Sequence, residues 1–163
     1  MNSSFLLTIL QQLLEEYTEL YNMSVSKTEI IKKNDITSLN DIINKEAKYL
    51  LSIDMLEKKR IEAVYAILSG HEWSGEIPTL SDCIKVVPAE DAPKLKSIQS
   101  DLTNMIEELR NRNYLNQELI YQSMQFVSLS LSMLKPKQTP PNYGPTAKQQ
   151  SQHKNEKLFD SQV

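Results

Sequence analysis

The chain has 163 residues, 40% of them hydrophobic and 24% charged, which is enough for one domain with a modest core and too little for two. Only 3 glycines are present, which excludes glycine-rich phosphate-binding loops. The net charge is −3. From Lys135 onward five lysines and two acidic residues, Glu156 and Asp160, give +3, so residues 1–134 carry −6. An acidic body of this kind argues against nucleic acid as a partner.

The first 34 residues predict one long amphipathic helix. Its apolar residues recur at steps of three and four: Leu6, Leu10, Leu13, Leu14, Tyr17, Leu20, Tyr21, Val25 and Ile31. The stretch "MNSSFLLTIL" has neither a basic leading segment nor a small-residue cleavage site, and no run in the chain reaches the roughly 18 apolar residues of a membrane span. We therefore predict a cytoplasmic protein without membrane insertion.

A second helix is predicted from about Ile36 to Ser69, antiparallel to the first because the connecting turn is short. Lysines in "KKND" favour the carboxyl end of the first helix, and Asp35 is suited to cap the second. The expected seam of the second helix consists of Leu39, Ile43, Leu50, Ile53, Ile61, Val64 and Leu68.

The stretch "GHEWSGEIP" breaks the helical pattern and predicts a loop, in which Trp73 either folds back on the bundle end or contacts a partner. His71, Glu72 and Glu76 lack the histidine pair of a helical metal site, so we interpret them as a solvated loop. Thr79 and Asp82 have the spacing of a capping box, which predicts a short third helix over "TLSDCIKVV". The only cysteine, Cys83, can form no internal disulfide; we interpret it as a packing residue, which fits a reducing compartment.

Pro93 favours the first turn of a last helix over residues 92–134, which would be roughly 60 Å long at 1.5 Å per residue. Pro136 ends it, and the segment beyond is rich in Pro, Gln and Lys, so we predict a bundle domain over residues 1–135 and a flexible, disordered C-terminal tail over 136–163. Three long helices and one short one predict an all-α fold, an antiparallel bundle or extended coiled coil.

The composition offers no nucleophile beside a base and no cluster of metal ligands, so we expect no catalytic residues, metal or cofactor. Two amides, Asn113 and Asn116, fall on the apolar stripe of the last helix. Because an unsatisfied buried amide costs about 1–3 kcal/mol, the two amides are either hydrogen-bonded across the bundle, which we predict, or placed where the bundle does not close. An internal polar layer with Glu46, Glu57 or Arg60 is one interpretation, with Arg60, Tyr17 or Tyr21 as partners of the amides; a surface pair between Glu57 and Arg60 is the other.

A second apolar stripe occupies only the C-terminal half of the last helix. Its members are Leu115, Leu119, Phe126 and Met133, and Met124 would add adaptable surface. Either these residues extend the core, or they form a face for an incoming amphipathic helix.

With its helices placed, the chain resembles the FlgN family of flagellar type III export chaperones. The segment "KTEIIKKNDITSLNDIINKEAKYLLSIDMLEKKR" is similar to the family's pattern through Lys27, Leu39, Glu46, Leu56, Glu57 and Arg60, and "NYLNQELIYQSMQF" through Asn113, Asn116 and Leu119. Tyr143 and Gly144 correspond to a later Tyr-Gly pair, although Pro145 departs from the family's ending.

This resemblance implies a cytoplasmic chaperone that binds the C-terminal helices of hook–filament junction proteins and delivers them to the export gate and its ATPase complex. It also implies client binding toward the C-terminal part of the chain, where Leu115, Leu119, Met124, Phe126, Met133 and Tyr143 are the candidates. The alternative is a structural or adaptor bundle that self-associates, even weakly, through the last helix. Measuring particle size against concentration separates the two hypotheses.

Overall fold

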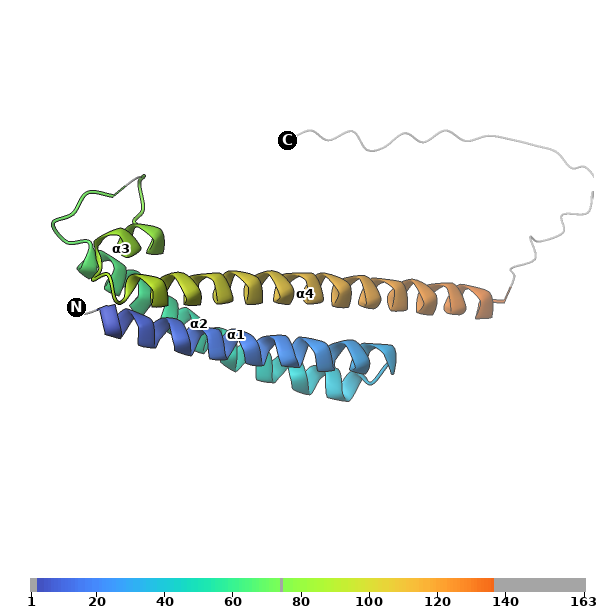
Figure 1. Ribbon diagram of the computed structural model, residues 1–163. Helices are drawn as coiled ribbons and strands as arrows, with labels where there is room; N and C mark the ends of the chain where they lie inside the picture. Colours follow the sequence, from blue (N-terminus) through green and yellow to red (C-terminus); the bar gives the residue numbers. More distant parts are fainter. Residues whose placement is uncertain (1–2, 74, 137–163) are drawn as a thin grey trace, which may run out of the picture.

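The computed structural model describes residues 3–73 and 75–136, and they form four helices without a strand (Figure 1). The helices are α1 (Ser3–Lys32), α2 (Ile36–Ile67), α3 (Leu80–Val86) and α4 (Ala92–Leu134). The predicted all-α fold is confirmed, and α4 has the predicted bounds. The expected disordered tail, which includes Tyr143, lies outside the described residues.

The turn between α1 and α2 is built from three successive residues of "KND". The amide of Asn34 donates to the Ile31 carbonyl at 3.0 Å and that of Asp35 to the Ile30 carbonyl at 3.2 Å, while Asn34 adopts a φ of 54°. These bonds are those of a Schellman motif, in which asparagine is one of the few residues that tolerate the left-handed position. The Asp35 side chain then accepts from the Ser38 amide at 3.0 Å, so one turn both ends α1 and starts α2.

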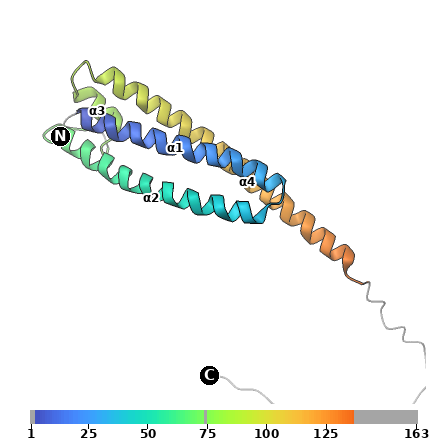
Figure 2. The same ribbon diagram turned by 90° about the horizontal axis from the view of Figure 1, so that it is seen from below.

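Helix α1 lies between the other two long helices (Figure 2). Helix α2 runs antiparallel to it, as predicted, whereas α4 runs parallel to it. The parallel register follows from contacts at both ends of α1: Ser3 donates to the Asp91 carboxylate just before α4, and Ser24 contacts Asn113 near the middle of α4.

The core is a single cluster on α1 and the faces that pack against it. Its buried members are Leu6, Ile9, Leu10, Leu13, Leu20, Ile53, Leu56, Ala63, Val64, Leu68, Leu80, Cys83, Leu95, Ile98 and Leu102. It is densest where α1 begins and α2 ends. The second half of α4 contributes only Asn116 to the fully buried residues.

The predicted seam of α2 is partly wrong. Ile43, Leu50 and Ile61 are 47%, 56% and 43% exposed, whereas Ile42 and Leu56 are buried. The burial is shifted around the helix because α2 packs only on α1 along most of its length. In the described residues no Cα atom of α2 lies within 8 Å of a Cα atom of α4.

Helix α3 packs against α2 and α4 at the end of the bundle where α1 begins. The predicted capping box is present: the Thr79 amide donates to the Asp82 carboxylate at 3.1 Å and the Asp82 amide to the Thr79 hydroxyl at 3.3 Å. In the loop before it, Trp73 contacts Tyr65 of α2 edge to face, with ring centroids 6.3 Å apart. Trp73 therefore folds back on the bundle end.

Helix α4 continues well past the turn between α1 and α2 (Figures 1 and 2). Asn116 bonds to Ser24 and Thr28 of α1, which ends one to two turns beyond them at Lys32, so the last three to four turns of α4 have no α1 beside them. Val127 and Leu134, which continue the core stripe in sequence, are accordingly 54% and 80% exposed.

Candidate functional site

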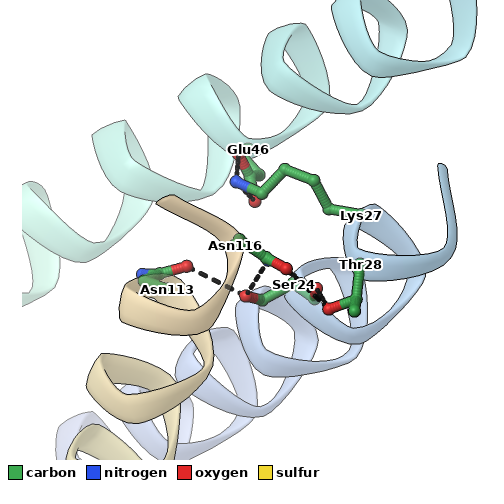
Figure 3. A network of polar contacts seen from close by, with 6 residues as sticks. All are labelled: Ser24, Lys27, Thr28, Glu46, Asn113 and Asn116. Atoms are coloured by element: carbon green, nitrogen blue, oxygen red, sulfur yellow. Dashed lines mark hydrogen bonds and ion pairs between the residues drawn. The ribbon is translucent and has the colours of Figure 1, made fainter. Parts of the chain in front are cut away.

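A polar cluster joins α1 to α4 near the end of α1 (Figure 3). Asn116 is 2% exposed; its Nδ2 donates to the Ser24 carbonyl at 2.8 Å and to Ser24 Oγ at 3.1 Å, and its Oδ1 accepts from Thr28 Oγ1 at 2.6 Å. Ser24 Oγ in turn donates to Asn113 Oδ1 at 2.9 Å. Both amides are thus paired across the bundle, and their partners are small hydroxyl residues on α1.

The sequence interpretation named different partners for these amides. Arg60 instead donates from Nε to Glu57 at 2.8 Å, one turn away on α2, which is the surface pair considered from sequence. Glu46 forms an ion pair with Lys27 at 2.7 Å, and both side chains are 15% exposed. The predicted Arg60 and tyrosine partners are therefore wrong. The amides bond to Ser24 and Thr28, because these residues lie opposite them in the parallel register of α1 and α4.

Tyr17 lies close to the Glu57–Arg60 pair. Burial raises the pKa of the Tyr17 phenol above its ordinary value, the Glu57 carboxylate raises it further, and the Arg60 guanidinium opposes both. The phenol therefore stays protonated and neutral across the physiological range.

The projecting half of α4 exposes large apolar side chains on several sides. Among the candidates, Met124, Phe126 and Met133 are 67%, 71% and 78% exposed, Leu115 is 41% exposed and Leu119 is half-buried. The chain has no charged residue from 119 to 134. Uncharged helix surfaces that expose several large apolar side chains to water are a common feature of protein-binding sites.

The candidates do not share one face. At about 100° per residue, Met124 lies on the side of α4 that faces α2, whereas Leu115, Leu119, Phe126 and Met133 lie on the opposite side. A pocket of about 350 Å³ beside Leu115 is lined also by Tyr21, Glu108, Asn111 and Arg112.

Sequence reasoning missed a continuous depression on the α2 side. A first pocket of about 410 Å³, here called the turn pocket, is lined by Ile30, Ile31, Asn34, Asp35, Ile36, Leu39, Ile120, Ser123, Met124, Val127, Ser128 and Leu131. A second pocket of about 320 Å³, here called the middle pocket, is lined by Tyr17, Leu20, Lys27, Glu46, Leu50, Leu109, Asn113, Asn116, Gln117 and Ile120. They share Ile120, and together we call them the trough. The signal in the sequence was the spacing of the aliphatic residues Ile36, Leu39 and Leu50 on one side of α2.

Within residues 3–73 and 75–136, no group of three or more His, Cys, Asp or Glu side chains is placed to hold a metal ion. None of the helices in this part of the chain is long and apolar enough to cross a membrane. Every buried side-chain nitrogen and oxygen atom in these ranges has a hydrogen-bond partner.

A helical bundle with paired polar groups and a bare apolar helix end has the features of a protein-binding module. The sequence model of the family described as "FlgN protein" matches residues 1–151, and the chain belongs to this family of flagellar export chaperones. The chain is similar to a Bacillus subtilis (strain 168) protein named "Uncharacterized protein YvyG", with 29% identity over 164 residues that span the whole of both chains. No solved structure matches the chain significantly.

Proposed function

We propose that the chain is a cytoplasmic chaperone for hook–filament junction proteins, which binds their C-terminal helical segments and delivers them to the flagellar type III export apparatus. The observation that supports this proposal is the uncharged, exposed end of α4, where Phe126 and Met133 stand 71% and 78% in solvent. Burial of such side chains against the apolar face of another helix removes apolar surface from water and so stabilises the complex.

Binding alone explains the protective part of this role. A ligand that binds only the unassembled client stabilises that state by mass action, and no nucleotide or covalent step is required. The client helix that would otherwise assemble with other subunits is covered while it is bound. Handover to the export gate and its ATPase complex belongs to the same proposal, and it requires that those components weaken this contact.

Isothermal titration calorimetry with the purified C-terminal region of each junction protein of the same organism tests the proposal. We expect a 1:1 complex with at least one of them. Phe126→Asp should weaken it by about ten-fold or more, because an interface core tolerates an added charge poorly, whereas the exposed Gln125→Asp on the polar side of α4 should have little effect. Absence of binding to every junction protein would overturn the proposal.

A second candidate function rests on the same exposed surface. If two copies cover each other's α4 ends, the protein is a self-associating adaptor bundle. Sedimentation at increasing concentration distinguishes the two: an adaptor forms a stable oligomer, whereas any self-association of a chaperone is weak and gives way to a 1:1 client complex.

A further inference from the structure

The space between α2 and α4 has the geometry of a missing helix. Packed helices with axes 8–10 Å apart and Cα atoms about 2.3 Å from each axis bring some Cα atoms within roughly 6 Å. Each of α2 and α4 packs in this way on α1, yet their own Cα atoms stay more than 8 Å apart throughout the described ranges. Viewed along the bundle axis, α1, α2 and α4 therefore occupy three positions of a four-helix bundle, with α1 between the other two. The trough runs along the fourth position, diagonally opposite α1.

Helix α3 occupies this fourth position at one end. It packs on α2 and α4 but, among the residues that the structure describes, not on α1. Cys83 Sγ lies 4.0 Å from the Val64 carbonyl of α2, and Ser81 Oγ accepts from Gln99 of α4 at 3.1 Å. The chain therefore builds two turns of a four-helix arrangement, and the trough continues that interface toward the α1–α2 turn.

The wall that α2 presents to the trough is apolar although it is exposed. The α2 residues that line it are Ile36, Leu39, Glu46 and Leu50, three of them aliphatic. At about 100° per residue, Leu50 continues an exposed stripe with Ile43 and Ile61 that lies roughly 100° from the buried face of α2. A helix with two apolar stripes is expected where it packs against two neighbours. Helix α1 covers one stripe, and only the second stripe lacks a covering helix over this length.

The trough also limits the chemistry of what can fill it. From Leu109 to Leu131 it follows α4 for 22 steps, or about 33 Å, which is the length of a helix of roughly 20 residues. Its ends are mostly aliphatic, and the Asp35 carboxylate at the turn is engaged with Ser38. In the middle the charges of Lys27 and Glu46 neutralise each other, while the exposed amide of Gln117 offers hydrogen bonds. An occupant must therefore present an uncharged aliphatic face with a hydroxyl or amide near its centre.

We propose that the trough is the docking site of the client, which enters as one amphipathic helix in line with α3 and completes a four-helix bundle with α1, α2 and α4. This inference rests on the proposed chaperone function and adds the α2 side of α4 to the binding surface. The Phe126 side of the α4 end, which does not line the trough, contacts the part of the client region outside this helix. The sequence of residues 137–163 does not have the pattern of such a helix: Pro140, Pro141 and Pro145 fall in its first part, and the large aliphatic residues of the rest are confined to the last six positions.

Two matched pairs of exposed leucines test this site. Leu50 and Leu131 line the trough, whereas Leu51 and Leu129, 69% and 61% exposed, lie on the outer sides of the same helices. With the full chain and the purified junction-protein C-terminal region as probe, Leu50→Asp and Leu131→Asp should each weaken binding about ten-fold or more, and Leu51→Asp and Leu129→Asp by less than about two-fold.

Photo-crosslinking tests the same site without introducing a charge into the helix. Benzoylphenylalanine at position 50 should crosslink the probe and the same group at position 51 should not. Equal effects of Leu50→Asp and Leu51→Asp, with loss of binding only on Phe126→Asp, would overturn the trough while leaving the chaperone proposal intact. If crosslinks from position 50 join two copies of the chain instead, the occupant is a second copy and the inference is wrong. Failure of the unaltered chain to bind any junction protein overturns the chaperone proposal itself and removes the basis of the trough assignment.

Discussion

Asn116 is the buried polar residue whose removal is most informative about the α1–α4 contact. Its side chain is 2% exposed, donates two hydrogen bonds to Ser24 and accepts one from Thr28. Asn116→Ala removes all three bonds and leaves a small cavity. Asn113→Ala is the matched control, because Asn113 is half-buried and makes one bond with Ser24.

The expected fall in the free energy of unfolding depends on whether the groups left behind keep other hydrogen bonds. A net contribution of about 0.5–1.5 kcal/mol per hydrogen bond gives about 1.5–4.5 kcal/mol for three bonds. The hydroxyls are not stranded: Ser24 keeps its bond to Asn113, and Thr28 Oγ1 keeps its bond to the Ser24 carbonyl at 3.1 Å. We therefore expect Asn116→Ala to lower the free energy of unfolding by about 2–3 kcal/mol and Asn113→Ala by about 1 kcal/mol or less.

Urea denaturation followed by circular dichroism at the helical band measures both values. In a chain of this size about 2–3 kcal/mol corresponds to a fall in melting temperature of roughly 5–10 °C. If Asn116→Ala were no more destabilising than Asn113→Ala, the buried amide would not stabilise the α1–α4 contact, and the reasoning from satisfied hydrogen bonds would be refuted.

Three further predictions concern other parts of the chain. Lys27→Met strands the Glu46 carboxylate, which is 15% exposed, and should lower the free energy of unfolding by about 1–2 kcal/mol in urea titrations; no change would mean that water already solvates Glu46. The Thr79 hydroxyl donates to Asp82 and holds the pKa of that carboxyl below the ordinary value of about 3.9, so ionised Asp82 stabilises the fold above that pH and less below it. The loss of melting temperature in Asp82→Ala should accordingly be larger at pH 7 than at pH 3, and a loss independent of pH would contradict the capping role of the charge. Deletion of residues 147–163 should leave the melting temperature unchanged, since that segment is poor in apolar residues; a large drop would contradict the tail prediction.

Local sequence signals determined where α2, α3 and α4 begin. Asp35, the Thr79–Asp82 spacing and Pro93 each act through the backbone within a few residues of themselves, so their effect is the same in any tertiary setting. The family pattern also depends on the order of residues along the chain, and the family it indicated is the one whose sequence model matches residues 1–151.

The partners of the side chains depended on how the helices pack. Periodicity placed Asn113 and Asn116 on an inward stripe, but only the parallel register of α1 and α4 put Ser24 and Thr28 opposite them. The same limit applied to α2, whose two apolar stripes merged into one predicted seam because a sequence pattern does not state how many neighbours a helix has. Tertiary packing covers one stripe with α1 and leaves Ile43 and Leu50 in solvent. Helix capping is local and can be read from neighbouring residues, whereas burial depends on distances between segments that are far apart in the chain.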